Sequence, residues 1–482
     1  MSISKNNEQS ARLPARIKAG YAIGQATDSI GFNVFYFFFL FFLTDVAGIA
    51  AGAAGTISLI AVTWDAVTDP IVGHISDNLS SKYGRRRPMM LAALVPYCIC
   101  VYLLFNNIES GADMKFVYFC MIAILFWSSY KVFVIPYFAL GAELTGDFNE
   151  RTSLRVWASV IMYGAVMLAS AAPLMIVQKT LEAGGDDSRG WGNVGLIFAV
   201  IIAVTLLTCV KATKGGELVT KDAYKVEKGG REGSFVMSFA GNIASIFKIK
   251  PVKFLVGSVL MWALVCSMVS GGLVYLMSSN LGYSPEKQSL CYVIMSLSAI
   301  FWLPFINYGA AKFDKQKVYF ATMLVAGLCM ASFKIFNFPA MWALIIFLFI
   351  FNFGNSTFWT LYYSMMYDIS ELDEFVTGKR REGTIAALMS FAQKLGAAVA
   401  LWMTGQVLEA GGYAGEAAVQ TAEAMNAILS VNTWIPGLIG VIAALFAFGY
   451  PLTREKFGAL TAALEAKRAG RGYSTEMFEK LL

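Results

Sequence analysis

Charged residues are scarce in this chain. Asp, Glu, Lys and Arg make up only 15% of its 482 residues, whereas 57% are hydrophobic and the mean hydropathy is +0.59. Soluble globular domains carry about a quarter charged residues. One soluble core cannot hide this much apolar surface, so the composition predicts a protein that crosses a membrane many times.

Histidine and paired cysteines are also lacking. The one histidine, His74, cannot form a zinc site alone. The seven cysteines are scattered through apolar segments without paired spacing, which is typical of small buried side chains and not of a disulfide framework. No nucleophile–base constellation, nucleotide loop or metal cluster appears, so we expect neither an enzyme nor a cofactor. The polar N-terminus carries no small-residue cleavage site, and we expect no cleaved signal peptide.

Apolar runs of about 20 residues, long enough to cross a hydrocarbon core, recur along the chain. They predict an all-α membrane protein with about twelve transmembrane helices, near 19–46, 53–76, 88–107, 115–142, 155–178, 192–212, 252–281, 287–311, 317–338, 340–369, 383–408 and 431–451. The longest polar interruption separates two six-helix bundles. The expected parts are the N-terminal bundle with its tail (1–212), a cytoplasmic linker (213–250), the C-terminal bundle (251–452) and a cytoplasmic tail (453–482).

The basic residues predict the orientation. Most of the 38 Lys and Arg fall inside if both termini are cytoplasmic. The net charge of +6 then reflects topology and contact with anionic membrane lipid, and it does not indicate a nucleic-acid partner. We expect a multi-pass plasma-membrane protein that functions as a monomer.

Three aspartates lie deep within the predicted spans, away from their ends: Asp28 in the first, and Asp65 and Asp69 in the second. The last two are four residues apart, so they share a helix face about 6 Å apart along the axis. A carboxylate in hydrocarbon is costly unless it has a partner or lines a polar cavity, and it therefore indicates function. The alternative is a structural pair neutralised by lysine.

Several motifs carry a resemblance to a known family. The pattern G-x-x-x-D then G-R-R-R over 73–87 resembles the loop signature of the major facilitator superfamily. More specifically, the chain resembles the glycoside–pentoside–hexuronide:cation symporters, the melibiose-carrier family. The matching stretches are FFLTDVAG around 42–48, WDAVTDPIVG (64–73), VIPYFAL (134–140), DFNERTSL (147–154) and FAQKLG (391–396).

The resemblance implies a major facilitator fold and symport of a glycoside, pentoside or hexuronide with Na⁺ or H⁺ by alternating access. In the family, the aspartates matching Asp65 and Asp69 bind the coupling cation, and the lysine matching Lys394 lies between the cation and sugar sites. The tyrosine matching Tyr130 belongs to the sugar site. Oxygen ligands suit sodium, while a carboxylate in the same place could carry a proton.

The chain also departs from that pattern. Val134 stands where the family has a further helix-four aspartate, and Ser159 stands where it has a sugar-contacting arginine. Arg155, one turn before Ser159, is the candidate substitute. Lys131 is an added charge where the family often has a small polar residue. Proton coupling, or a charge-balanced site in which Lys131 stands in for a cation, therefore remains open beside sodium coupling.

The remaining site predictions concern the sugar and the gates. The predicted substrate-binding residues are Asp28, Tyr130, Lys131, Arg155, Trp359 and Lys394. The predicted cytoplasmic gate consists of Asp77, Arg85, Arg86, Arg151, Asp368 and Glu371, whose charges would pair across the bundles.

Two other functions remain possible on the sequence alone. A carrier of a lysolipid or another amphiphile would need an apolar cavity that opens to the bilayer, and relatives with that role share the fold. A membrane-embedded sugar sensor would carry a sizeable cytoplasmic output domain, and the C-terminal tail is short for one.

Overall fold

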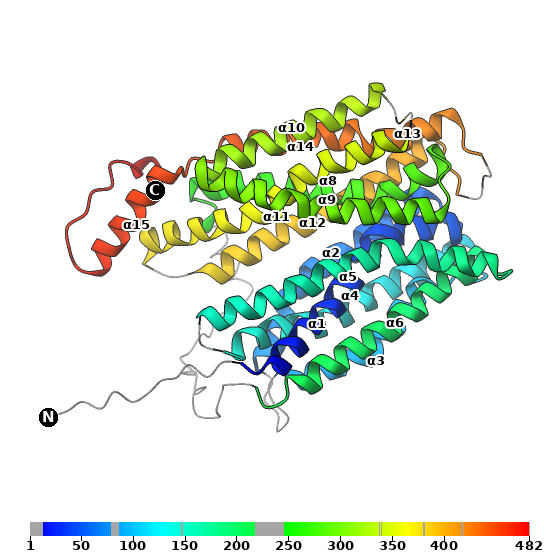
Figure 1. Ribbon diagram of the computed structural model, residues 1–482, viewed down its shortest axis with the longest axis horizontal. Coiled ribbons are helices and arrows are strands. Elements are labelled where there is room, and N and C mark those ends of the chain that lie inside the picture. Colours follow the sequence, from blue (N-terminus) through cyan, green and yellow to red (C-terminus); the bar gives the residue numbers. More distant parts are fainter. Residues whose placement is uncertain are drawn as a thin grey trace. The chain divides into compact units, whose positions relative to one another are not determined.

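The structure is a computed structural model that describes residues 13–78, 86–145, 148–216, 245–336, 338, 340–378, 381–415, 417 and 419–481. All regular secondary structure in this part of the chain is helical, which confirms the predicted all-α class (Figure 1).

The helices follow the predicted spans closely. They are α1 (Ala15–Val34), α2 (Ala51–Asn78), α3 (Arg87–Leu104), α4 (Ala112–Glu143), α5 (Phe148–Glu182), α6 (Asp187–Ala212), α8 (Lys250–Tyr275), α9 (Pro285–Lys312), α10 (Lys315–Phe336), α11 (Met341–Thr377), α12 (Glu382–Ala410), α13 (Ala422–Asn432), α14 (Trp434–Phe448) and α15 (Arg454–Arg468). Three π-helical turns, Phe35–Phe39, Phe42–Val46 and Leu276–Asn280, accompany α1 and α8.

Among the described residues, eleven helical spans are long and apolar enough to cross a membrane. The first predicted span is not one of them, because α1 carries charged residues such as Arg16 and Asp28 and π-helical turns follow it. The last span is Ala422–Phe448, formed by α13 and α14, and so begins earlier than the predicted 431.

The chain forms two compact units. Unit 1 consists of Met1–Phe35 and Val67–Gly230, and unit 2 of Tyr36–Ala66 and Arg231–Leu482. Residues 36–66, which the sequence assigns to the N-terminal bundle, are thus compact with the C-terminal helices. The chain passes from unit 2 to unit 1 within α2, between Asp65 and Asp69.

Each unit is a bundle with its own core. In unit 1, α1 packs against α5 and α6, and α3 packs against α4 and α6. In unit 2, α8 packs against α12 and α14, while α10 lies beside α14 and α11 (Figure 1). Fully buried tryptophans anchor both cores, Trp127 and Trp191 in unit 1 and Trp262 in unit 2.

Residues 36–66 are tied to α12 by polar contacts and by a close backbone crossing. The Gly52 N–H donates a hydrogen bond to the Glu409 carboxylate, and the Gln406 amide donates one to the Gly52 carbonyl at 3.1 Å. One turn along α12, a Cβ added at Gly405 would overlap the carbonyl oxygen of Ala51. A small residue at this position lets the two backbones approach closely.

The C-terminal tail, predicted only as a cytoplasmic extension, folds onto unit 2. Its helix α15 packs on the end of α11, where Arg468 pairs with Glu374 at 2.5 Å. The Lys467 ammonium donates to the Phe375 carbonyl at 2.7 Å, and Tyr473 and Phe478 pack edge-on against the Phe375 ring. We refer to this end of unit 2 as its tail end.

The close crossing of α2 and α12 predicts the effect of one added methyl group. We expect Gly405→Ala to lower the stability against thermal unfolding in detergent by about 1–3 kcal/mol, because the new Cβ forces the backbones apart. Gly383→Ala is the matched control on the same helix, since nothing lies within 4 Å of a Cβ added there. It should leave stability unchanged or raise it by up to about 1 kcal/mol. Equal melting temperatures for the two variants would contradict the crossing.

Candidate functional site

Asp28 lies at the centre of a hydrogen-bonded cluster in unit 1. Its Oδ1 accepts a hydrogen bond from the Tyr130 hydroxyl at 2.5 Å, and its Oδ2 accepts one from the Gln25 amide at 2.5 Å. Gln25 lies one helical turn before Asp28 on α1, and Tyr130 comes from α4. The structure therefore brings together two of the predicted substrate-binding residues, Asp28 and Tyr130.

Lys131 pairs with Asp69 in the same unit. Its Nζ lies 2.6 Å from the Asp69 Oδ1, and the lysine is only 4% exposed. The ammonium also lies 5.5 Å from the centroid of the Tyr130 ring. The side chain of Asp69 is 32% exposed, so this pair is partly open.

Asp65 pairs with a different lysine, in unit 2. Its Oδ2 lies 3.2 Å from the Nζ of Lys394 on α12, and the aspartate is fully buried. Beside Lys394 in the sequence, Gln393 accepts a hydrogen bond from the Tyr362 hydroxyl at 3.4 Å. The fully buried carboxylate thus has its charge balanced within its own unit.

The two carboxylates on α2 therefore differ in their environments although they lie one turn apart. Opposite charges about 4 Å apart attract by about 4 kcal/mol at the effective dielectric of a protein near its surface, and by more in a dry interior. Removal of one partner from a buried pair leaves an uncompensated charge. Any ligand that binds either carboxylate must therefore compete with a lysine.

The other two predicted sugar contacts lie at more open positions. Arg155 on α5 is exposed, with its guanidinium 5.8 Å from the centroid of the Phe138 ring. Trp359 on α11 is 40% exposed and lies edge-on to the Tyr362 ring, at 6.1 Å between centroids. An arginine and an exposed indole face are suited to bind sugar hydroxyls and C–H surfaces respectively.

The predicted gate residues find partners within their own units. Arg86 donates to Glu143 at 2.8 Å and to the Ser76 hydroxyl at 2.7 Å, and Arg151 donates to the Thr145 carbonyl at 2.9 Å. Arg85 and the side chain of Asp77 lie outside the described residues.

At the tail end of unit 2, Asp368 pairs with Lys315 at 2.8 Å. Asp373, close to the predicted Glu371, forms a bidentate pair with Arg381. The hydrogen bonds that Arg381 donates to the Asp373 carboxylate raise the pKa of the guanidinium above its ordinary value. Pairing of Asp368 and Glu371 across the bundles stays a prediction.

A second polar cluster, at the opposite end of unit 2, was not predicted. The Tyr413 hydroxyl donates to Asp45 at 2.7 Å, the Thr44 hydroxyl donates to the same carboxylate at 2.6 Å, and Thr44 bonds the Tyr275 hydroxyl at 2.8 Å. Burial raises the pKa of Tyr413, and the Asp45 carboxylate raises it further. The aspartate in the FFLTDVAG stretch was the available signal. Of its two partners, Thr44 is its neighbour in the sequence, whereas Tyr413 comes from a distant part of the chain.

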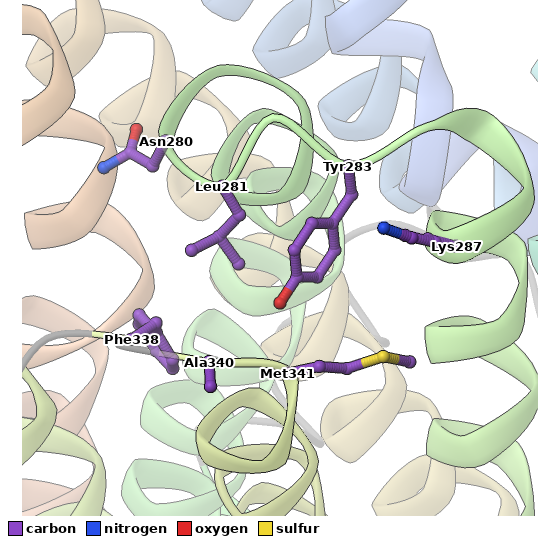
Figure 2. A pocket seen from close by; sticks show the side chains of 7 residues that line it. All are labelled: Asn280, Leu281, Tyr283, Lys287, Phe338, Ala340 and Met341. Carbon is purple, nitrogen blue, oxygen red and sulfur yellow. The ribbon is translucent and has the colours of Figure 1, made fainter.

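One pocket of unit 2 lies away from these carboxylates (Figure 2). It has a volume of about 400 Å³ and lies where α8 ends and α9 and α11 begin. Figure 2 shows the Tyr283 ring directed towards Ala340 and Met341, with Lys287 to one side. None of the predicted site residues lines this pocket.

The chain is similar to known membrane transporters along most of its length. The family model described as MFS/sugar transport protein matches residues 20–454. The putative glycoside/cation symporter YagG of Escherichia coli (strain K12) is 25% identical over 474 residues, which are 96% of this chain and 97% of that protein. The sodium-dependent lysophosphatidylcholine symporter 1-B of Danio rerio is also 25% identical, over 93% of this chain and 89% of its own.

Among solved structures, the crystal structure of a D-xylose-proton symporter matches with a TM-score of 0.63. The identity is 15%, and the match covers 91% of this chain and 98% of that one. This likeness shows a shared fold, and the predicted major facilitator architecture is confirmed by it.

The buried pair predicts strong energetic coupling between its partners. We expect Asp65→Asn and Lys394→Gln each to lower stability by about 3–5 kcal/mol, because each leaves an uncompensated charge, and the double variant to lose far less than the sum. The exposed pair Glu374–Arg468 serves as the control, with a coupling of about 0–1 kcal/mol for Glu374→Gln with Arg468→Gln. Thermal unfolding in detergent measures both cycles. Additive effects at Asp65 and Lys394 would disprove the pairing.

Proposed function

This chain belongs to the MFS/sugar transport protein family, and on that premise we propose that it is a secondary active transporter. Its substrate is a glycoside, pentoside or hexuronide, and a cation crosses with it. The observation that carries this proposal is the set of charged and polar groups within the helices: Asp28 with Tyr130 and Gln25, Asp69 with Lys131, and Asp65 with Lys394.

The similarity to a putative glycoside/cation symporter over 96% of the chain supports this substrate class. The chemistry of the polar cluster supports it too. A carboxylate, a phenol and an amide together donate to and accept from sugar hydroxyls, and an exposed aromatic face such as that of Trp359 covers a sugar's C–H surface. We propose Asp28, Tyr130, Lys131 and Arg155 in unit 1, and Trp359 and Lys394 in unit 2, as sugar contacts.

The coupling would run through the carboxylates of α2. We propose that Asp65 and Asp69 respond to the coupling cation, Na⁺ or H⁺. A cation that neutralises one carboxylate weakens the ion pair between that carboxylate and its lysine. The ammonium of the lysine can then bind the substrate. Binding of cation and sugar then favour each other, and this mutual coupling free energy is the thermodynamic basis of symport.

The transport cycle is alternating access, the mode expected for this fold. Charged groups near the helix ends can change partners when access changes. We propose Asp77, Arg85, Arg86, Arg151, Asp368 and Glu371 as a cytoplasmic gate, and we add Asp45, Tyr413 and Glu409 as a gate at the opposite end.

The setting of the protein follows from its spans. It is a multi-pass membrane protein. We propose that it lies in the plasma membrane with both termini in the cytoplasm, acts as a monomer in contact with lipid, and has neither enzymatic activity nor a nucleic-acid partner.

A second candidate function is transport of a lysolipid. It is favoured by the match to the sodium-dependent lysophosphatidylcholine symporter 1-B of Danio rerio over 93% of the chain. The hydrogen-bonding groups around Asp28 are better suited to a polyhydroxylated substrate than to an acyl chain, so we place this candidate second.

Uptake into proteoliposomes tests the two candidates side by side. Radiolabelled glycosides, pentosides, hexuronides and lysophosphatidylcholine would be offered with an imposed sodium gradient or an imposed pH gradient. Gradient-driven sugar accumulation supports the proposal. Accumulation of the lysolipid alone would replace it with the second candidate.

The carboxylates of α2 predict which variants lose coupling. We expect Asp65→Asn and Asp69→Asn to abolish gradient-driven accumulation while the proteins remain folded in the membrane, because neither amide can be neutralised by a cation. Asp113→Asn, at an exposed position in the first turn of α4, is the control and should accumulate sugar as the wild type does. Unchanged accumulation by both α2 variants would remove these residues from the coupling site.

A further inference from the structure

Lys131 occupies the position of a cation bound to the Oδ1 of Asp69. Its Nζ lies 2.6 Å from the Asp69 Oδ1, the distance of a close ion pair. The lysine is 4% exposed, and its side chain is packed against the Tyr130 ring, with the ammonium 5.5 Å from the ring centroid. The ammonium is therefore a fixed part of the site and not a surface charge that samples many positions.

An ammonium and Na⁺ carry the same charge and seek the same oxygen atoms. A sodium ion bound to Asp69 would have to share the carboxylate with the lysine, with two positive charges in contact. Like charges at such a distance repel each other strongly in a medium of low dielectric. Asp69 with Lys131 in place is thus already neutralised, and it holds no net charge with which to attract a metal ion.

Two hydroxyl groups lie close to Lys131 on α4, those of Ser128 and Tyr130, and each oxygen can accept or ligate as well as donate. Residues three positions before and after Lys131 share its helix face. Ser128, on one side, donates its hydroxyl to the Ile124 carbonyl at 2.8 Å. Val134, on the other, is buried and apolar. The hydroxyl of the adjacent Tyr130 donates to Asp28 at 2.5 Å. Hard cations such as Na⁺ require several oxygen ligands, by analogy with Ca²⁺ and Mg²⁺ sites.

We propose that the ammonium of Lys131 replaces a metal cation at Asp69, so that this carrier neither binds nor requires Na⁺. This inference deepens the proposed function, since it removes sodium from the two coupling cations considered above. Its uptake test rests on that function, whereas its binding test does not.

The binding test needs no substrate. Purified full-length protein would be unfolded thermally in NaCl and in choline chloride at equal ionic strength. The wild type should melt at the same temperature in both salts. Lys131→Thr removes the ammonium and adds a hydroxyl oxygen, and it should melt at a higher temperature in NaCl, because Na⁺ now binds the native state. Lys131→Arg keeps the positive charge and is the matched control, with no response to Na⁺.

A second variant and two contradicting outcomes complete the melting experiment. If Lys131→Thr does not fold, Lys131→Gln takes its place, since its amide still donates to Asp69 but carries no charge. Sodium-specific stabilisation of the wild type overturns the proposal, and so does a folded threonine or glutamine variant that gains no response to Na⁺.

The uptake test uses a sugar that the wild type accumulates. Wild-type uptake should be the same with and without a sodium gradient, and uptake by Lys131→Thr should rise about fivefold or more with one, the usual scale of a coupling free energy. Sodium-stimulated uptake by the wild type would overturn the inference while it supports symport. If no sugar is taken up, the proposed function fails and the melting experiment alone decides the role of Lys131.

Discussion

A carboxylate within an apolar helix bundle must be neutralised, and this constraint governs the contacts of Asp28, Asp65 and Asp69. Asp65 and Asp69 occupy successive turns of α2, and each lies against a lysine from a different helix: Lys394 on α12 and Lys131 on α4. Asp28 is stabilised instead by hydrogen bonds from Tyr130 and Gln25. Asp65 and Asp69 are each neutralised by one lysine, so the loss of charge on one member of a pair leaves the charge of the other member uncompensated.

The two carboxylates of α2 belong to different compact units of the chain. The passage from unit 2 to unit 1 falls between Ala66 and Val67, so Asp65 and Asp69 belong to different units although one helical turn separates them. A ligand that changes the charge of either carboxylate therefore acts on a helix that both units share. Ionic groups within the spans of membrane proteins mark substrate and ion pathways, and here they also coincide with the connection between the compact units.

Much of this arrangement could be predicted from the sequence. The apolar runs predicted the spans, and the four-residue spacing placed Asp65 and Asp69 on one face of a helix. The sequence also raised the possibility of neutralisation by lysine and of Lys131 as a substitute cation. It could not assign Lys131 to Asp69 and Lys394 to Asp65, because that assignment depends on which helices pack together and at what height.

Other features were missed for different physical reasons. The π-helical turns at 35–39 and 42–46 differ from an α-helix only in hydrogen-bond register, which single residues do not specify. The contacts of residues 36–66 with α12 depend on Gly405, whose lack of a side chain matters only once the facing helix is known. The helix α15 had a usable signal, since the segment from Arg454 to Arg468 is rich in Ala, Leu, Glu and Lys, which are strong helix formers.

The most direct test of the central claim is a recording of sugar-evoked charge movement on a solid-supported membrane that carries the reconstituted protein. The account predicts that a neutral glycoside or pentoside evokes a charge movement of the sign that cation entry with sugar requires, or that a hexuronide, whose own negative charge cancels that of one cation, is accumulated along an imposed cation gradient. Absence of charge movement with every neutral sugar and of gradient-driven hexuronide accumulation, from protein shown to be folded, would contradict cation-coupled sugar symport.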